Sequence, residues 1–211
     1  MTVSTARQSL LPAGLIGLSL VPVVAGGVRV GQLTTGAAVT PDNARFFASP
    51  LPVVVHIVGA TVFCLLGAFQ FVPRIRQRHP RYHRLAGRLL LVPAGLAAAL
   101  SGLWMSAFYP RPADVGDAVT AIRLLFGSAM VASLVLAVRA IRQGRVGAHR
   151  AWMARGYAIG LAAGTQAFTQ LPWMVLVGPL DATSKAPLML AGWLINLAVA
   201  EWAIRRRPVS G

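Results

Sequence analysis

The chain has 211 residues, of which 56% are hydrophobic and only 12% are charged. A typical soluble domain carries about 25% charged residues, so this composition excludes an ordinary soluble globular protein. The 20 Lys and Arg residues outnumber the 5 Asp and Glu residues and give a net charge of +15, which in a soluble protein would indicate nucleic-acid binding. Here the arginines cluster at the ends of apolar runs and no nucleic-acid-binding motif is present, so we expect no nucleic-acid partner.

Six apolar runs follow one another along the chain, and each is long enough to cross a bilayer as a helix of about 20 residues. They are Leu10–Val30, Leu51–Val72, Leu89–Tyr109, Val119–Ile141, Ala151–Val177 and Pro187–Ile204. Proline-rich or charged spacers separate them. The pattern predicts an all-α protein, a polytopic transmembrane helical bundle of six helices.

The first run permits a second interpretation. Met1–Arg7 followed by Leu10–Val24 resembles a secretory signal peptide that would be cleaved near Ala25. The run is longer than the apolar core of most signal peptides, so we predict a membrane helix here. A five-helix mature protein, with Met1–Ala25 removed, is the alternative.

The charges of the spacers predict the orientation. Fifteen of the 20 basic residues fall on one side of the predicted membrane, namely Arg7, Arg74, Arg76, Arg78, Arg81, Arg84, Arg88, Arg139, Arg142, Arg145, Arg150, Arg155, Arg205, Arg206 and Arg207. The other side has Arg29, Arg45, Arg111, Arg123 and Lys185, together with all four aspartates. Because cytoplasmic segments carry the excess of Lys and Arg, we expect both termini to be cytoplasmic and the protein to lie in the plasma membrane.

We expect one membrane domain over residues 1–211. Residues 1–50 would form an extra N-terminal helix and an outer loop, 51–177 a core of four helices, and 178–211 a C-terminal helix with a basic tail. The sequence does not indicate the oligomeric state.

Polar residues near the predicted outer ends of the helices form the first candidate site. Ionisable groups within membrane helices usually face the bundle interior or a polar cavity, which draws attention to His56. Gln70 shares its helix face, and Ser101, Arg123, Gln166 and Gln170 lie at the outer depth on other helices. We expect most of this set to line a chamber, open to the outside, for a small amphiphile. The alternative is that His56 and Gln70 only bond to neighbouring helices.

Two histidines at the predicted inner edge form the second candidate site. His83 and His149 each stand near the start of a helix that runs outward, so they lie at the same depth. A pair of facing imidazoles can ligate the iron of a b-type haem, and the propionates would lie near Arg84, Arg88, Arg150 and Arg155. The same groups could instead bind an anion or lipid phosphate, and histidines at helix starts often bond only backbone or water. We expect no other metal site, because neither Cys nor carboxylate lies close in sequence.

Glu201, the one glutamate, lies at a depth similar to that of Arg155. An unpaired charge in a membrane helix is costly, so we expect a structural ion pair between the two. No Ser-His-Asp set, paired carboxylates, Walker loop or H-E-x-x-H motif occurs, and we therefore expect no enzymatic activity.

Three motifs carry a resemblance to a known family. The first joins His56-Ile-Val-Gly59 with Leu66-Gly-Ala-Phe-Gln-Phe71, the second joins Arg78-His-Pro80 with His83-Arg-Leu-Ala-Gly-Arg88, and the third is Ala148-His-Arg-Ala-Trp-Met-Ala-Arg-Gly-Tyr-Ala158. Over about residues 50–175 the chain resembles the bacterial predicted membrane proteins grouped as domain of unknown function 2306. The resemblance implies no activity, but it selects His56, Gln70, His83, His149, Trp152 and Arg155 as residues to test. Many members have an arginine where this chain has Gly164-Thr-Gln-Ala167.

The sequence therefore favours a non-enzymatic membrane protein, either a binding or transport module or an accessory protein. Expected partners are anionic lipid head groups at the cytoplasmic face and a small amphiphile or quinone. The alternative is a small electron-transfer protein, linked to haem b or quinone, that uses His83 and His149.

Overall fold

The structure is a computed structural model that describes residues 5–206, and within that range it contains helices and no β-strand. Six long helices form the molecule: α1 (Thr5–Thr35), α3 (Pro50–Gln70), α6 (Val92–Phe108), α7 (Asp117–Arg142), α8 (Val146–Leu176) and α9 (Ala182–Arg205). Short helices fill the spacers, namely α2 (Ala44–Ala48), α4 (Pro73–Arg78) and α5 (Pro80–Ala86), and the π-helix η1 (Gly87–Leu91) joins α5 to α6. The all-helical class expected from the sequence is confirmed.

Five of the helical segments are long and apolar enough to cross a membrane: Leu10–Thr35, Pro50–Gln70, Pro80–Phe108, Asp117–Arg142 and Ala182–Arg205. Helix α8, with 31 residues, has the length but is too polar to be counted by composition. It packs against α1, α3, α6, α7 and α9. Most residues from Gly156 to Gln166 are buried between these helices, whereas Leu171–Leu176 is exposed. The buried section presents little surface to lipid, so it can be more polar than the other spans.

Several predicted helix boundaries were wrong, because the helices begin earlier than their apolar runs. The helix predicted from Leu89 continues from Pro80 through η1, and the helix predicted from Ala151 begins at Val146. The helix predicted from Pro187 begins at Ala182, because Asp181 caps it.

The Asp181 carboxylate accepts hydrogen bonds from the backbone N–H groups of Thr183 and Ser184, and the Ser184 hydroxyl completes a capping box. These hydrogen bonds lower the pKa of Asp181, and the bond from the Ser184 side chain contributes the largest part of the effect. The cap therefore favours an ionised carboxylate at this helix N-terminus.

A stripe of three glycines on α8, spaced four residues apart, receives three other helices. A Cβ atom at Gly156 would lie 3.2 Å from a methyl carbon of Leu134 on α7, and one at Gly160 would lie 2.9 Å from the Phe63 ring on α3. A Cβ atom at Gly164 would clash with the backbone carbonyl of Leu18 on α1. Only glycine allows approach this close, so the stripe fixes how α1, α3 and α7 pack on α8.

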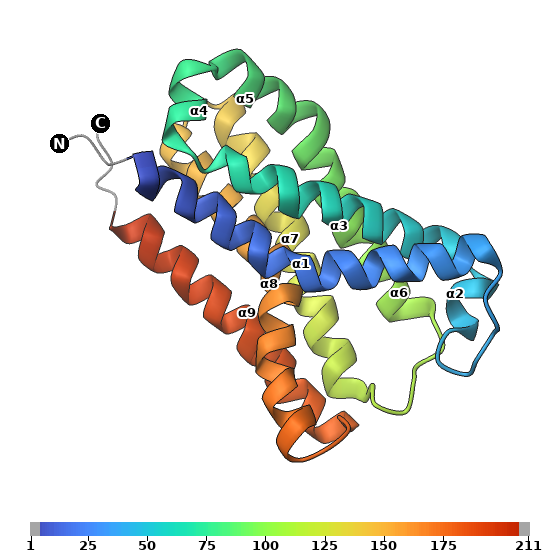
Figure 1. Ribbon diagram of the computed structural model, residues 1–211. Coiled ribbons are helices and arrows are strands. Elements are labelled where there is room, and N and C mark those ends of the chain that lie inside the picture. Colours follow the sequence, from blue (N-terminus) through green and yellow to red (C-terminus); the bar gives the residue numbers. More distant parts are fainter. Residues whose placement is uncertain (1–4, 207–211) are drawn as a thin grey trace.

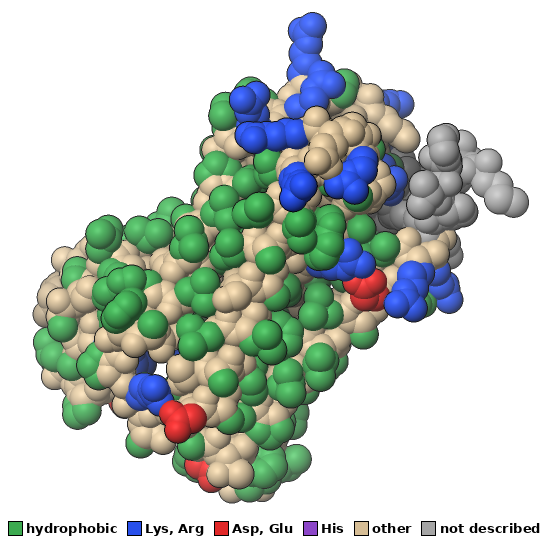
Figure 2. Space-filling model, turned by 180° about the vertical axis from the view of Figure 1, so that it is seen from behind, with side chains coloured by type: hydrophobic (Ala, Val, Ile, Leu, Met, Phe, Trp, Pro, Cys, Tyr) green, Lys and Arg blue, Asp and Glu red, His purple; other side chains and the backbone are tan. Residues whose placement is uncertain are grey.

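The long helices diverge at one end of the molecule (Figure 1). Helices α1 and α3 run together, as do α8 and α9, and the two pairs separate at the end opposite α4 and α5. Figure 2 shows Lys and Arg side chains gathered at the α4–α5 end. The molecule thus has a basic end and a divergent end.

We expect Gly164→Ala to destabilise the protein by about 1–3 kcal/mol, because the new methyl group would have to displace the α1 backbone. Gly17→Ala on α1 is the matched control, since no atom lies within 4 Å of the added carbon and the change favours helix. Equilibrium unfolding in mixed micelles measures both variants. A Gly164→Ala protein as stable as Gly17→Ala would contradict the close approach of α1 to α8.

Candidate functional site: a chamber between the diverging helices

A cavity of about 790 Å³, here called the chamber, lies at the divergent end. Its lining comes from α1, α2, α3, α6, α7, α8 and α9. The space-filling view shows the surface hollowed at the end away from the main basic cluster, beside a Lys or Arg side chain (Figure 2). The splay of the two helix pairs therefore creates a space that the side chains do not fill.

One part of the chamber is apolar. Phe63, Met130, Ile159 and Leu161 line it and belong to the main hydrophobic core of the protein. Trp193 of α9 also lines it and stacks on Phe126, with ring centroids 4.6 Å apart and planes 3° from parallel. This wall suits a hydrocarbon group.

The other part of the chamber is strongly basic. Five cationic side chains and two carboxylates line it, namely Arg29, Arg45, Arg111, Arg123 and Lys185 with Asp42 and Asp114. Lys185 pairs with Asp114, and Arg111 in the loop before α7 pairs with Asp117, the first residue of that helix. Within residues 5–206, Arg29, Arg45 and Arg123 form no ion pair with a carboxylate. The lining therefore carries three more positive than negative charges.

Arg29 and Arg45 share an aromatic neighbour. Each guanidinium carbon lies 4.5 Å from the centroid of the Phe46 ring. Burial lowers the pKa of Arg45, and the positive charge of Arg29 lowers it further, while Asp114 and Asp42 partly oppose the effect. The lowered pKa reflects burial of the guanidinium first and the neighbouring charge of Arg29 second, and a nearby anion would oppose both effects.

Tyr109 attaches this basic region to α6. Its ring packs edge-on against Phe46 with centroids 5.6 Å apart, and its hydroxyl donates to the Ser49 carbonyl oxygen at 2.5 Å. Burial raises the pKa of Tyr109, so the phenol stays protonated and able to donate at neutral pH. Helix α2, which carries Arg45, is therefore fixed to the end of α6.

Arg123 extends the basic lining onto α7. The side chain is half-buried and lines the chamber. No hydrogen bond or ion pair joins its guanidinium group to another residue in the described part of the chain. A partly desolvated guanidinium without a protein acceptor has its hydrogen-bond donors available to an anion.

His56 lines the chamber and also joins two helices. Its Nδ1 lies 2.8 Å from the carbonyl oxygen of Ala98 on α6. Because a carbonyl can only accept, Nδ1 carries the hydrogen, and in the neutral imidazole Nε2 then keeps a lone pair. Ser101 Oγ lies 3.5 Å from the same nitrogen but donates to the Ala97 carbonyl at 2.5 Å. Ser101 is thus next to the histidine without lining the chamber.

Of the remaining residues predicted for this site, one lines the chamber and two lie outside it. Gln166 lines the chamber, although its amide donates to the Met189 carbonyl at 3.2 Å and so ties α8 to α9. Gln170 and Gln70 do not line it. Gln70 shares a helix with His56 but stands 14 residues away, about 21 Å along the axis, at the other end of α3. Gln170 is one turn beyond Gln166, past the cavity wall.

Sequence reasoning missed Arg29, Arg45 and Lys185 as chamber residues. The sequence showed these residues only as basic residues on the outer side of the predicted membrane. That outer positive charge was the one available indication of a basic site. Charges on loops and helix ends far apart in sequence gave no indication that they would surround one space.

The histidines of the second candidate site lie at the basic end. His149 Nδ1 donates to the Ala137 carbonyl at 3.0 Å, which ties α8 to α7, while His83 Nδ1 is buried without a hydrogen-bond partner. Arg84 and Arg88 are exposed. Across the described residues, no cluster of three or more His, Cys, Asp or Glu side chains could hold a metal ion. Neither histidine lines the chamber.

Arg155 and Glu201 lie in contact at this end. Arg155 Nε is 2.5 Å from Glu201 Oε1 and Nη2 is 3.1 Å from Oε2, so the pair is bidentate. The Arg155 guanidinium also lies 4.7 Å from the Trp152 ring centroid. The contact joins α8 to α9.

An all-helical chain with five apolar helices of membrane-spanning length is a polytopic membrane protein. It belongs to the family described as predicted membrane protein, domain of unknown function 2306 (DUF2306), whose family model matches residues 53–204. This match confirms the resemblance seen in the three motifs. No curated protein and no solved structure matches the chain. His56 and Arg123 lie inside the matched region, whereas Arg29 and Arg45 precede it.

A double-mutant cycle tests the Arg155–Glu201 contact. With side chains 28% and 33% exposed, we expect Arg155→Gln and Glu201→Gln to show a coupling free energy of about 1 kcal/mol in unfolding measurements. Arg150→Gln combined with Glu201→Gln is the control and should be additive. Equal coupling in both cycles would show that general charge, and not the bidentate contact, stabilises the protein.

Proposed function

We propose that this membrane protein is a binding or transport module that holds a small amphiphile with an anionic head group in the chamber. The observation that carries the proposal is the grouping of Arg29, Arg45 and Arg123, none paired with a carboxylate, around one cavity that also has an apolar wall. Its volume falls within the range of about 300–1,000 Å³ that is usual for small-molecule sites.

The two parts of the chamber would hold the two parts of the ligand. The guanidinium groups would bind the anion with charge-assisted hydrogen bonds, which are about twice as strong as neutral ones. The hydrocarbon would lie against Phe63, Met130 and Trp193. His56 Nε2 would accept a hydrogen bond from a hydroxyl or amide of the ligand.

The topology that we propose places this chamber on the outer side of the plasma membrane. Six helices would cross the bilayer, with α8 as the polar central span, and both termini would be cytoplasmic. The basic end supports this orientation, because the start of α1, the end of α9 and the α4–α5 segment lie on the same side of the molecule (Figure 1). The positive-inside rule assigns such an end to the cytoplasm.

Tryptophan quenching by a brominated amphiphile tests the proposed ligand class. We expect 12-bromododecanoate to quench the fluorescence of the purified protein saturably, and Trp193→Phe to remove most of that quenching. Arg123→Gln should weaken the apparent affinity about tenfold or more, because a charged hydrogen bond is lost. Arg150→Gln, a charge-matched change at the basic end, should have no effect.

The cationic analogue 12-bromododecyltrimethylammonium separates head-group recognition from the partitioning of a hydrocarbon chain. It should quench Trp193 weakly. Equal quenching by both amphiphiles, or unchanged binding of the anion in Arg123→Gln, would contradict a chamber selective for anions.

A further inference from the structure

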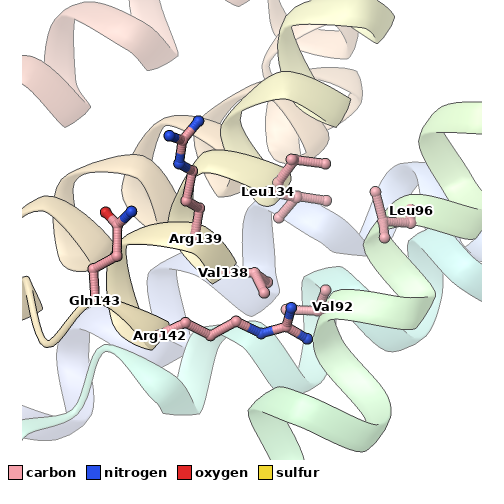
Figure 3. A pocket seen from close by; sticks show the side chains of 8 residues that line it. Val92, Leu96, Leu134, Val138, Arg139, Arg142 and Gln143 are labelled. Atoms are coloured by element: carbon pink, nitrogen blue, oxygen red, sulfur yellow. The ribbon is translucent and has the colours of Figure 1, made fainter.

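A second cavity, here called the groove, lies between α6 and α7 towards the basic end. Its volume is about 480 Å³. Figure 3 shows Val92 and Leu96 of α6 facing Leu134 and Val138 of α7 across it. Arg139 and Arg142, in the last turn of α7, complete the lining of the groove. The groove thus combines a hydrocarbon-lined cleft between two helices with two guanidinium groups.

The backbone beside the groove is irregular for an identifiable reason. Pro93 lacks an N–H group and cannot bond the carbonyl four residues earlier, and the π-helix η1 ends directly before Val92. Single-turn π-helices within α-helices are frequent at functional sites. The irregular turn therefore stands where α6 begins to line the groove.

The two arginines of the groove have no protein counter-ion. Across residues 5–206 neither guanidinium group forms a hydrogen bond or an ion pair, and both side chains are exposed. The carboxylate of Glu201 is already held by Arg155. In Figure 3 the Arg142 side chain extends from α7 towards Val92, so its charge lies beside the cleft between the two helices.

We propose that the groove is a binding site for an anionic phospholipid. One acyl chain lies along Val92, Leu96 and Val138, and the phosphate is bound by Arg142 and Arg139. The charge complementarity and the apolar cleft together favour a lipid, since a free phosphate ion would leave the cleft empty. The inference is independent of the ligand proposed for the chamber.

Native mass spectrometry of the protein, released from detergent with added phosphatidylglycerol or phosphatidylcholine, tests this site. We expect a phosphatidylglycerol adduct that phosphatidylcholine does not match. Arg139→Gln/Arg142→Gln should weaken it about 30-fold, at about fivefold for each arginine near an anionic lipid. Arg78→Gln/Arg81→Gln removes the same charge from exposed positions in α4 and α5, and it should weaken the adduct less than threefold.

A steric variant separates the groove from general charge attraction. Leu96→Trp fills the cleft and keeps every arginine, and it should remove the tight adduct while the thermal unfolding temperature shows that the protein is folded. Val138→Trp gives a second filled groove if Leu96→Trp fails to fold. Equal loss in both arginine pairs, an adduct that survives a filled groove, or equal binding of both lipids would overturn the proposal.

Discussion

The closeness of α8 to its neighbours is the constraint on which the rest of the structure depends. Gly156, Gly160 and Gly164 form one face of α8, and α7, α3 and α1 approach it in turn. Lipid offers little hydrophobic driving force for helix association, so van der Waals contact between closely packed helices has to provide it. Polar bonds add to it, among them the Thr165 hydroxyl, which donates to the Asn196 side-chain oxygen at 2.7 Å. Such contacts hold a polar helix at the centre of the bundle.

The chamber is a consequence of this packing. The α1–α3 pair packs against the α8–α9 pair near the α8 glycines, and the two pairs separate towards the divergent end. The space between them has an apolar wall on one part and basic side chains on the other. Placing several guanidinium groups around one cavity is costly unless something compensates their charge. Lys185 and Arg111 have carboxylate partners, while Arg29, Arg45 and Arg123 do not. A ligand with a negative charge would complete the site, which is why the proposed function begins from these residues.

The sequence predicted the helices far better than the site. Apolar runs of about 20 residues leave few alternatives to membrane helices, and their order fixed the class. The prediction from apolar runs placed the helix starts too late, because a polar first turn such as the one capped by Asp181 carries no apolar signal. His56 and Gln166 were recognised because polar groups in apolar helices are rare. Gln70 shares a helix face with His56 but lies at the other end of α3. Arg29 and Arg45 were missed because only tertiary packing brings them to the chamber.

Thiol labelling of the chamber tests the central claim most directly. In a Cys64→Ala background, Ser106→Cys places a single thiol in the chamber lining. Intact cells are treated with membrane-impermeant methanethiosulfonates that carry either a sulfonate or a trimethylammonium group, and an Ala38→Cys variant before α2 calibrates their intrinsic rates. The account predicts that Ser106→Cys reacts from outside, that it favours the sulfonate relative to Ala38→Cys, and that Arg123→Gln reduces this preference. A thiol that does not react from outside, or that favours the cationic reagent, would contradict an outward-facing basic chamber.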